Sequence, residues 1–464
     1  MAERMSMTFD LGKPGQRNTK TEQTTHILVT LSDLRGRFSN QADEAPALPR
    51  RVDIETLDAL MAKLQPSLTP PWTAEPHAES LRFNELDQFH PDHLVHELPS
   101  AESWPSDEES ASSNTQQTGI SSASQAAPET DQETLSRLLG NQPLGVTAPS
   151  AGGSGKSRRQ QTLIDSVVQK LTEQASSEAG PATGHRTGES ADRFRSEVLR
   201  QLLHDPAFQQ LEASWRSLDW LLRNNPFDAE CPVYAIDFSL PGEHNAAVQP
   251  EQFEEISDTL YRSLTQLDPS ENQLILIFDK AIKPDAQDIA LLESLGRVAQ
   301  RLGAVLIGGA DAAFSDLEED SEIWRSWQAF RSQAMARNIV LCIPRLLLRL
   351  PYGNRYDPIE QFDFEECEDP GKRSDLLWGN PAYALSLILL SEDLQEGTFE
   401  ERRFTDWPSF AYSHDEETVF QPATEYLYTE KELQRLLSLG LVPALGSRRQ
   451  NSVQFPWLQT LKGE

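Results

Sequence analysis

Residues 338–353, NIVLCIPRLLLRLPYG, are the most informative stretch of this chain. A continuously apolar run is broken by a proline, then carries Arg345 and Arg349 four positions apart, and ends in a Pro-Tyr-Gly turn. If the segment is helical, both guanidinium groups leave one face of the helix, one turn apart. A guanidinium among apolar residues needs a carboxylate or carbonyl partner.

An acidic cluster shortly downstream supplies candidate partners for the two arginines, namely Asp363, Glu365 and Glu366. Two interpretations of such a set stay open. The charges can form an internal ion-pair network that holds the fold together, or they can make a contact between subunits. Catalysis is disfavoured because no nucleophile or base accompanies the pair.

Four motifs resemble the large subunit of the type VI secretion contractile sheath. They are HDPAFQQLEASWRSL at 204–218, RLLLRLPYG at 345–353, FDFEE at 362–366 and LWGNPAYA at 377–384. The resemblance implies structural or interface roles for residues within these motifs. These residues are Arg345, Arg349, Pro351, Tyr352, Gly353, Phe362, Phe364, Glu365, Glu366, Trp378, Gly379, Asn380, Trp215 and Arg216.

The first part of the chain has a different pattern. Alternation predicts a strand at 5–11, the apolar run at 26–31 predicts a more buried strand, and 54–64 reads as an amphipathic helix capped by Asp53. This order resembles the small sheath subunit over residues 5–98. Since the two subunits are separate chains in most members, we expect a fusion whose two parts fold against each other.

The last part of the chain reads as α/β. Residues 194–203 and 285–301 have helical periodicity, and 273–278 and 304–309 are wholly apolar strands. A strand, a helix and a second apolar strand predict a parallel pair buried on both faces. The predicted fold class is therefore α/β with α+β elements: a small N-terminal α/β part and a larger α/β domain with a mixed sheet, joined by a disordered linker.

We expect three regions: a small-subunit-like domain at 1–105, a low-complexity linker at 106–190 and a large-subunit-like domain at 191–464. The linker is rich in Ser, Gln, Ala and Gly, a composition typical of disorder. Short helical patterns interrupt it. The family resemblance implies that one of them serves as a helix that the AAA+ disassembly ATPase grasps, through Leu135, Leu138 and Leu139; docking on the protein's own surface is the alternative.

Charge and composition restrict the compartment and the partners. A formal net charge of −31 disfavours binding to nucleic acid and to anionic membranes. The three cysteines are scattered, as expected in a reducing cytoplasm. The N-terminus has no apolar signal core, and no apolar run approaches the ~20 residues that span a bilayer. We therefore expect a soluble cytoplasmic protein without membrane insertion.

Two further motifs invite a chemical role and are better explained otherwise. The sequence GGSGKS at 152–157 has Ser150 where a phosphate-binding loop needs glycine, and no buried strand precedes it. His90, His93 and His96 have a spacing that suits a metal on a helix, yet FHPD at 89–92 resembles a structural turn of the family. We expect no catalytic residue, no metal and no cofactor.

The expected function is that of a non-enzymatic sheath-like component of a type VI contractile tail, acting by packing and strand exchange. Expected partners are sheath subunits or other tail components, among them the inner tube, the baseplate or the AAA+ disassembly ATPase. The alternative is an accessory sheath mimic that binds the sheath end, the baseplate or the ATPase without forming a tube. Because the resemblance stops before the family's C-terminal strands, we expect the protein not to build long tubes alone.

Overall fold

The structure is a computed structural model. It describes residues 25–36, 48–72, 80–98, 185–227, 230–240, 250–394, 403–414 and 417–463. The predicted strand at 5–11, the linker at 106–190 with its leucine-containing helices, and the 152–157 motif lie outside the described residues. The described parts of the chain before residue 100 and after residue 191 form one compact unit.

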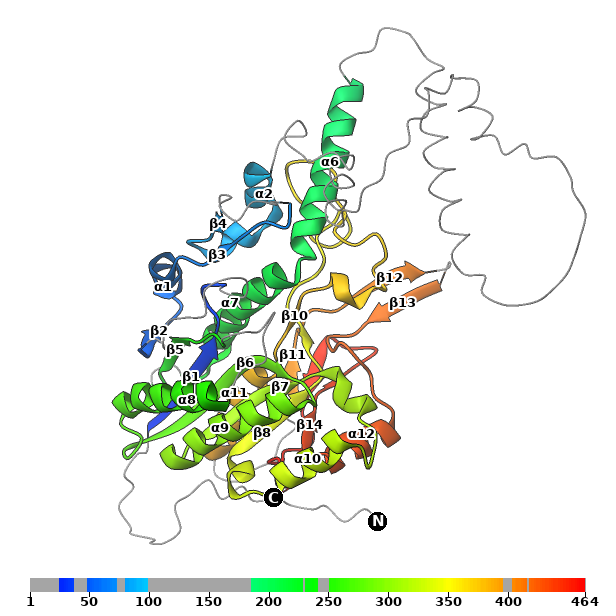
Figure 1. Ribbon diagram of the computed structural model, residues 1–464. Helices are drawn as coiled ribbons and strands as arrows, with labels where there is room; N and C mark the ends of the chain where they lie inside the picture. The colour runs from blue at the N-terminus through cyan, green and yellow to red at the C-terminus, as the bar shows by residue number, and fades with distance from the viewer. Residues whose placement is uncertain are drawn as a thin grey trace, which may run out of the picture. The chain divides into compact units, whose positions relative to one another are not determined.

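A seven-stranded mixed sheet organises this unit, with the order β14-β8-β7-β6-β1-β5-β2 (Figure 1). Every neighbouring pair is parallel except β2 and β5, which are antiparallel. The strands are β1 (Thr25–Ser32), β2 (Arg50–Val52), β5 (Val233–Asp237), β6 (Asn272–Ile282), β7 (Val305–Ala310), β8 (Ile339–Ile343) and β14 (Leu441–Pro443). The predicted parallel pair of apolar strands, β6 and β7, is confirmed.

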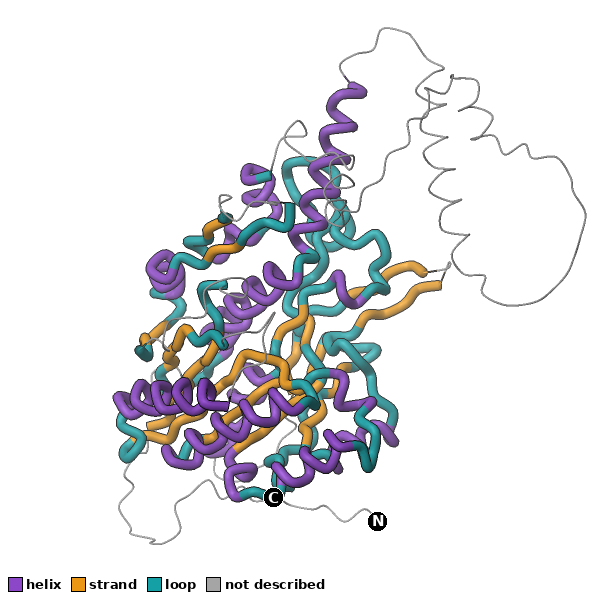
Figure 2. The backbone as a smooth tube through the Cα atoms, in the orientation of Figure 1, coloured by secondary structure: helices purple, strands orange, loops and turns teal. Residues whose placement is uncertain are grey.

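Helices cover both faces of the sheet, and each face has its own apolar core (Figure 2). Alternation along β1 shows the division, because Leu28 packs in one core while Ile27 and Val29 pack in the other. On the Leu28 side lie α1 (Leu57–Leu64), α7 (Pro206–Asn224) and α11 (Ala382–Leu394). On the opposite side lie α8 (Pro250–Leu264), α9 (Ala286–Leu302), α10 (Glu322–Arg331) and α12 (Glu430–Ser438).

Strand β1 lies in the interior of the sheet, although it comes from the N-terminal segment. It pairs with β5 on one side and with β6 on the other. More of the same segment packs on α7: the rings of Phe83 and Phe89 stack with centroids 4.3 Å apart, and Phe208 meets both edge-on. The indole Nε1 of Trp215 donates to the carbonyl oxygen of Leu34 at 3.0 Å. The described N-terminal segment is therefore part of the same core as the rest of the unit.

The remaining elements are short, apart from the 19-residue helix α6. In the N-terminal segment they are β3 (Ser67–Leu68), β4 (Leu81–Arg82), η2 (Leu86–Phe89), α2 (Pro91–Leu94) and η3 (Val95–Glu97). Further along are α6 (His185–Leu203), η4 (Thr265–Leu267), η5 (Ala312–Asp316), η6 (Ala334–Asn338), β9 (Leu346–Leu347), η7 (Arg373–Asp375), β10 (Trp378–Gly379), β11 (Arg403–Thr405), β12 (Phe410–His414), β13 (Glu417–Gln421), β15 (Leu445–Gly446) and β16 (Ser452–Gln454).

Helix boundaries follow local capping chemistry. Asp285 caps α9 as its side chain accepts from the backbone N–H of Asp288 at 2.8 Å. The predicted cap of α1 was wrong, because that helix begins at Leu57 with Thr56 as its N-cap. Asp53 instead closes the preceding turn, where its Oδ1 accepts from the backbone N–H of Thr56 at 2.9 Å. A carboxylate three residues before the N-cap thus forms a competing local turn.

Candidate functional site

The stretch at 338–353 is extended where it carries its arginines. It runs from β8 into β9, and β9 pairs antiparallel with β10. The helical premise for Arg345 and Arg349 is therefore not met. Residues four apart on an extended chain are about 13 Å apart, so each guanidinium has its own surroundings and its own carboxylate.

Arg349 is buried between two buried carboxylates. Its Nε donates to Glu212 Oε1 at 2.9 Å, and its Nη2 donates to Glu212 Oε2 at 3.3 Å. Its Nη1 and Nη2 also donate to the two carboxylate oxygens of Glu366, at 2.7 and 2.9 Å. The side chain of Arg349 is 8% exposed, against 0% for Glu212 and 1% for Glu366. One guanidinium thus holds two carboxylates in paired contacts.

Two more side chains complete a buried charge network of Glu212, Arg216, Arg349, Tyr352 and Glu366. Arg216 Nε donates to Glu212 Oε1 at 2.7 Å, and Arg216 Nη2 donates to the Tyr352 hydroxyl at 3.2 Å. The backbone N–H of Tyr352 donates to Glu366 Oε2 at 2.7 Å. With two arginines and two glutamates the network is neutral, and it joins α7 to the loop after β9 and to the 362–366 motif.

Three groups of the network keep their protonation state near neutral pH. Burial alone would raise the pKa of Glu212, but the charges of Arg349 and Arg216 outweigh it, so this pKa lies below its usual value. Burial likewise opposes the charge of Arg349, yet Glu212 and Glu366 raise the pKa of its guanidinium well above the ordinary range. Burial raises the pKa of Tyr352 to about 12. These three groups therefore act as connectors and are not poised to exchange protons.

Arg345 makes a second, more exposed connection. Its Nε and Nη2 donate to the two carboxylate oxygens of Glu425 at 2.9 and 2.7 Å. The backbone N–H of Glu425 also donates to the carbonyl oxygen of Arg345 at 3.0 Å. Glu425 is buried, whereas the arginine side chain is 45% exposed. This pair ties the segment after β8 to the segment after β13.

Of the carboxylates that the sequence offered, the structure places Glu366 against Arg349. Asp363 is exposed, and Glu365 Oε1 accepts from the backbone N–H of Asn354 at 3.1 Å. Sequence analysis missed Glu212 and Glu425. Glu212 lay in the quoted 204–218 motif, where a carboxylate inside an apolar helical face was the available signal.

The other predicted residues pack around this network. Pro351 and Phe364 are buried, and Phe362 packs edge-on against the ring of Phe364. Two glycines lie where a side chain would collide: a Cβ at Gly353 would overlap Glu365 Oε2, and one at Gly379 would lie 2.6 Å from Leu348 Cδ2.

The last two predicted residues make buried polar contacts. Trp378 Nε1 donates to the carbonyl oxygen of Arg373 at 2.7 Å. Asn380 Nδ2 donates to the carbonyl oxygen of Phe278 at 3.0 Å, and its Oδ1 accepts from the backbone N–H of Ala382 at 2.9 Å. Asn380 thereby joins the start of α11 to the second half of β6.

The histidine-rich segment has a capping role. His90 is the N-cap of α2, and its Nδ1 accepts from the backbone N–H of Asp92 at 3.2 Å. His93 and His96 are exposed. Within the described ranges, no group of three or more His, Cys, Asp or Glu side chains is placed to hold a metal ion. No helix in those ranges is both long and apolar enough to cross a bilayer.

Comparisons with known proteins identify the family of this chain. The family described as "VipB: EvpB/VC_A0108, tail sheath N-terminal domain" matches residues 189–462, and the chain belongs to this family of tail sheath proteins. It is 23% identical over 287 residues to the type VI secretion system sheath protein TssC1 of Pseudomonas aeruginosa. That alignment covers 56% of this chain and 58% of the relative, so the chain spans less than two thirds of the relative's length. The buried charge network lies inside the family match, whereas β1 lies outside it.

Proposed function

We propose that this chain is a non-enzymatic structural component of a type VI secretion apparatus, a sheath-like protein of the contractile tail. The observation that carries the proposal is the family match over 189–462. This range contains the charge network and five strands of the central sheet, β5, β6, β7, β8 and β14. The network supports a mechanical role, because its arginines and glutamates are engaged with one another in the interior.

We further propose that the N-terminal region, residues 1–105, stands in for a small sheath subunit and that 191–464 forms the large-subunit-like part. The insertion of β1 between β5 and β6 supports this. So does the burial of Leu34 and Phe89 in the core that contains α7. A long tether between two such parts raises their effective concentration to roughly millimolar and favours their association.

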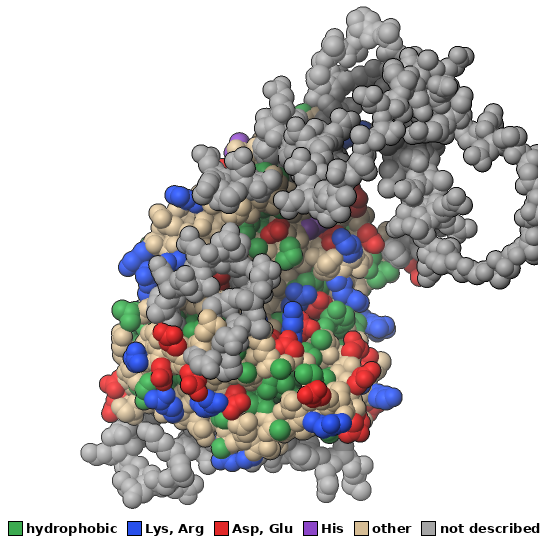
Figure 3. Space-filling model, in the orientation of Figure 1, with side chains coloured by type: hydrophobic (Ala, Val, Ile, Leu, Met, Phe, Trp, Pro, Cys, Tyr) green, Lys and Arg blue, Asp and Glu red, His purple; other side chains and the backbone are tan. Residues whose placement is uncertain are grey.

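Contacts with neighbouring subunits are proposed to include exchange of strands. The sheet ends at β2, which pairs with β5 alone among the described strands. An edge strand offers unpaired backbone groups to a partner's strand. Ile54, two residues beyond β2, is 49% exposed and would lie beside such a partner. Acidic and basic side chains are interspersed on the face drawn in Figure 3, so we expect any partner to be matched by local pairs of charges.

Electron microscopy and co-sedimentation of the purified protein with the small and large sheath subunits of the same apparatus test the proposal. We expect the chain to enter the tube wall with those subunits. Binding only to tube ends, to the baseplate or to the disassembly ATPase would favour the accessory function instead. Failure to associate with any of these components would refute a role in the tail.

A pair of variants tests the edge strand within the same assay. Ile54→Asp places a charge beside β2 and should reduce incorporation without changing the melting temperature. Trp457→Asp is the matched control, because Trp457 is 40% exposed elsewhere in the chain. Equal incorporation of the two variants would refute the use of β2 while leaving the wider proposal standing.

A further inference from the structure

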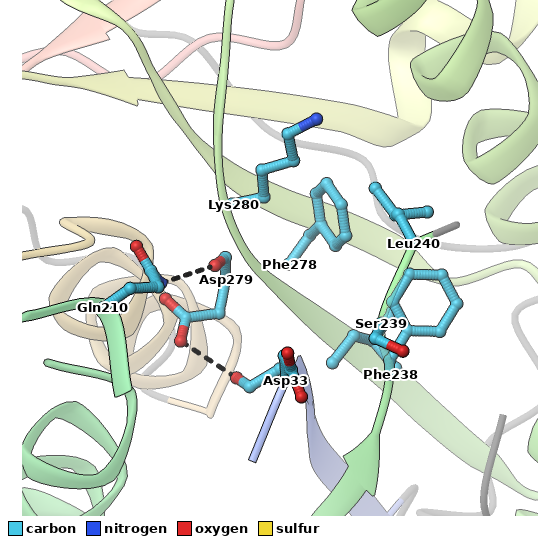
Figure 4. Close-up of a pocket in the computed structure, with 10 residues that line it drawn as sticks. Asp33, Gln210, Phe238, Ser239, Leu240, Phe278, Asp279 and Lys280 are labelled. Carbon is cyan, nitrogen blue, oxygen red and sulfur yellow. Dashed lines mark hydrogen bonds between the residues drawn. The ribbon is translucent and has the colours of Figure 1, made fainter. Parts of the chain in front are cut away.

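A small hollow of about 60 Å³ lies at the carboxyl ends of β1 and β6 (Figure 4). Asp279 lines it and lies one residue past Phe278, where the register between β6 and β7 shifts. Asp279 is 9% exposed. The hollow is lined by Leu31, Ser32, Asp33, Gln210, Phe238, Ser239, Leu240, Phe278, Asp279 and Lys280.

Hydroxyl groups from two other elements converge on the Asp279 carboxylate. Ser32 Oγ, at the end of β1, donates to Asp279 Oδ2 at 3.0 Å. The hydroxyl of Tyr383, on α11, lies 2.9 Å from both Ser32 Oγ and Thr30 Oγ1. From α7, Gln210 Nε2 donates to the backbone carbonyl oxygen of Asp279 at 3.5 Å. One carboxylate therefore links the N-terminal strand to β6, with α11 attached through the same hydroxyl groups.

The charged groups around Asp279 do not neutralise it. Lys280 points away from the carboxylate in Figure 4, and its Nζ pairs with Asp288 Oδ1 at 2.8 Å. Asp33, at the end of β1, adds a second acidic group to the same hollow. On β5, Asp237 pairs with Arg35 at 3.2 Å. The structure shows no ion pair to Asp279 within the described residues.

The remaining neighbours are uncharged or weakly acidic. On α7 these are Gln210 and Ser214, while Asn380 lies just before α11 and Tyr383 lies on it. Burial and the nearby Asp279 charge raise the pKa of Tyr383 well above its usual value, so its hydroxyl keeps its proton near neutral pH. Asp279 is therefore a group at this joint whose protonation changes under mild conditions, since its pKa is raised to about 6.

We propose that the docking of β1 against β6 and α11 is proton-linked through Asp279, so that mild acid tightens the joint between the N-terminal strand and the rest of the sheet. Removing the proton leaves a buried negative charge that only hydroxyl and amide groups stabilise. Undocking of β1 exposes the carboxylate to water and relieves that cost. The inference rests on contacts within this chain and does not depend on the proposed function.

The direction and size of the effect follow from linkage. Burial raises the pKa of Asp279 to about 6 from an ordinary value of 3.8, although the hydroxyl donors partly oppose the shift. The docked state then holds its proton more tightly than the undocked state. The extra stability that this proton gives the docked state is complete below the ordinary aspartate pKa, and it is lost as the pH rises through about 6. Between pH 5 and pH 7 the undocking equilibrium should increase about tenfold.

Amide hydrogen exchange in the full chain tests this. Protection factors for the β1 amides, corrected for intrinsic exchange rates, should fall about tenfold between pH 5 and pH 7. Asp279→Asn should abolish this dependence. Ser32→Ala removes a donor that stabilises the charged form, so it should move the midpoint to higher pH. Asp375→Asn is the matched control, because Asp375 is also buried but pairs with Lys372, and it should keep the wild-type profile.

Three results would overturn the inference. The first is a flat profile for β1 in the wild-type protein, which needs no variant to fold. The second is a midpoint that Ser32→Ala leaves unchanged. The third is an equal change at the amides of β1 and β8, since that would place the proton linkage in global unfolding and not in the docking of one strand.

Discussion

Replacing Arg349 with alanine removes the only residue of the charge network that contacts both buried glutamates. Glu212 would keep one cationic partner, Arg216 at 2.7 Å. Glu366 would keep the backbone N–H of Tyr352. Breaking one partner of a buried ion pair costs about 3–5 kcal/mol because a charge is left uncompensated in the interior. At ~2–4 °C per kcal/mol for domains of about 150–250 residues, the melting temperature should fall by roughly 10 °C.

Thermal and urea unfolding followed by circular dichroism would measure this loss in the full chain. Arg297→Ala is the matched control, since Arg297 pairs with Glu293 on the surface of α9 and is 47% exposed. Its effect should stay within about 0.5 kcal/mol. A double variant, Arg349→Ala with Glu366→Gln, should cost less than the sum of the single changes, because the neutral amide no longer needs a cation.

An unchanged melt for Arg349→Ala would refute the reasoning that this arginine is a structural connector. If the same variant lost binding to sheath subunits while keeping its melt, the residue would belong to an interface. Equal losses for Arg349→Ala and Arg297→Ala would show that burial does not decide the strength of these pairs.

Three further predictions concern other contacts. Trp215→Phe removes the buried indole donor to Leu34 and should lower the free energy of unfolding by about 1–3 kcal/mol. An unchanged free energy of unfolding would contradict the importance of this hydrogen bond. Gly36→Ala should destabilise by about 1–3 kcal/mol, since Gly36 has φ +73° and a Cβ there would lie 2.8 Å from the carbonyl oxygen of Ser67; a neutral result would contradict the need for glycine. The pKa of Glu212 is lowered, so ionised Glu212 stabilises the folded state above the ordinary glutamate pKa, and this stabilisation is lost as the pH falls. Glu212→Gln should therefore reduce the dependence of the free energy of unfolding on pH at the acid end, measured by denaturation between pH 3 and 7.

The sequence predicted the local elements well where apolar periodicity was strong. Strands β6 and β7 are continuous apolar runs, and a helix between two such strands favours parallel pairing by the handedness of the connection. Apolar periodicity could not predict that β1 would pair between β5 and β6. Its apolar run shows that it is buried, but nothing in the run says which strands, about 200 residues later, will flank it.

The candidate site illustrates the same limit. The composition of 338–353 showed that Arg349 needs carboxylates, and Glu366 lay close enough in the sequence to be proposed. Glu212 is 137 residues away from Arg349, on a helix whose own pattern reads as apolar. The spacing of Arg345 and Arg349 suggested one helix face, whereas pairing of β9 with β10 keeps the chain extended and overrides that local pattern.

The position of β1 in the sheet also affects how the chain can fold during synthesis. About 250 residues separate the end of β1 at Ser32 from the end of β6 at Ile282. At ~5–20 residues per second, a ribosome needs roughly 10–50 s to make that length. During this interval the apolar strand β1 has been made, but its partner β6 is not yet complete. Closing so long a loop is also slow. We therefore expect β1 to need a chaperone or transient local burial in the nascent chain, so that it does not aggregate before β6 is made.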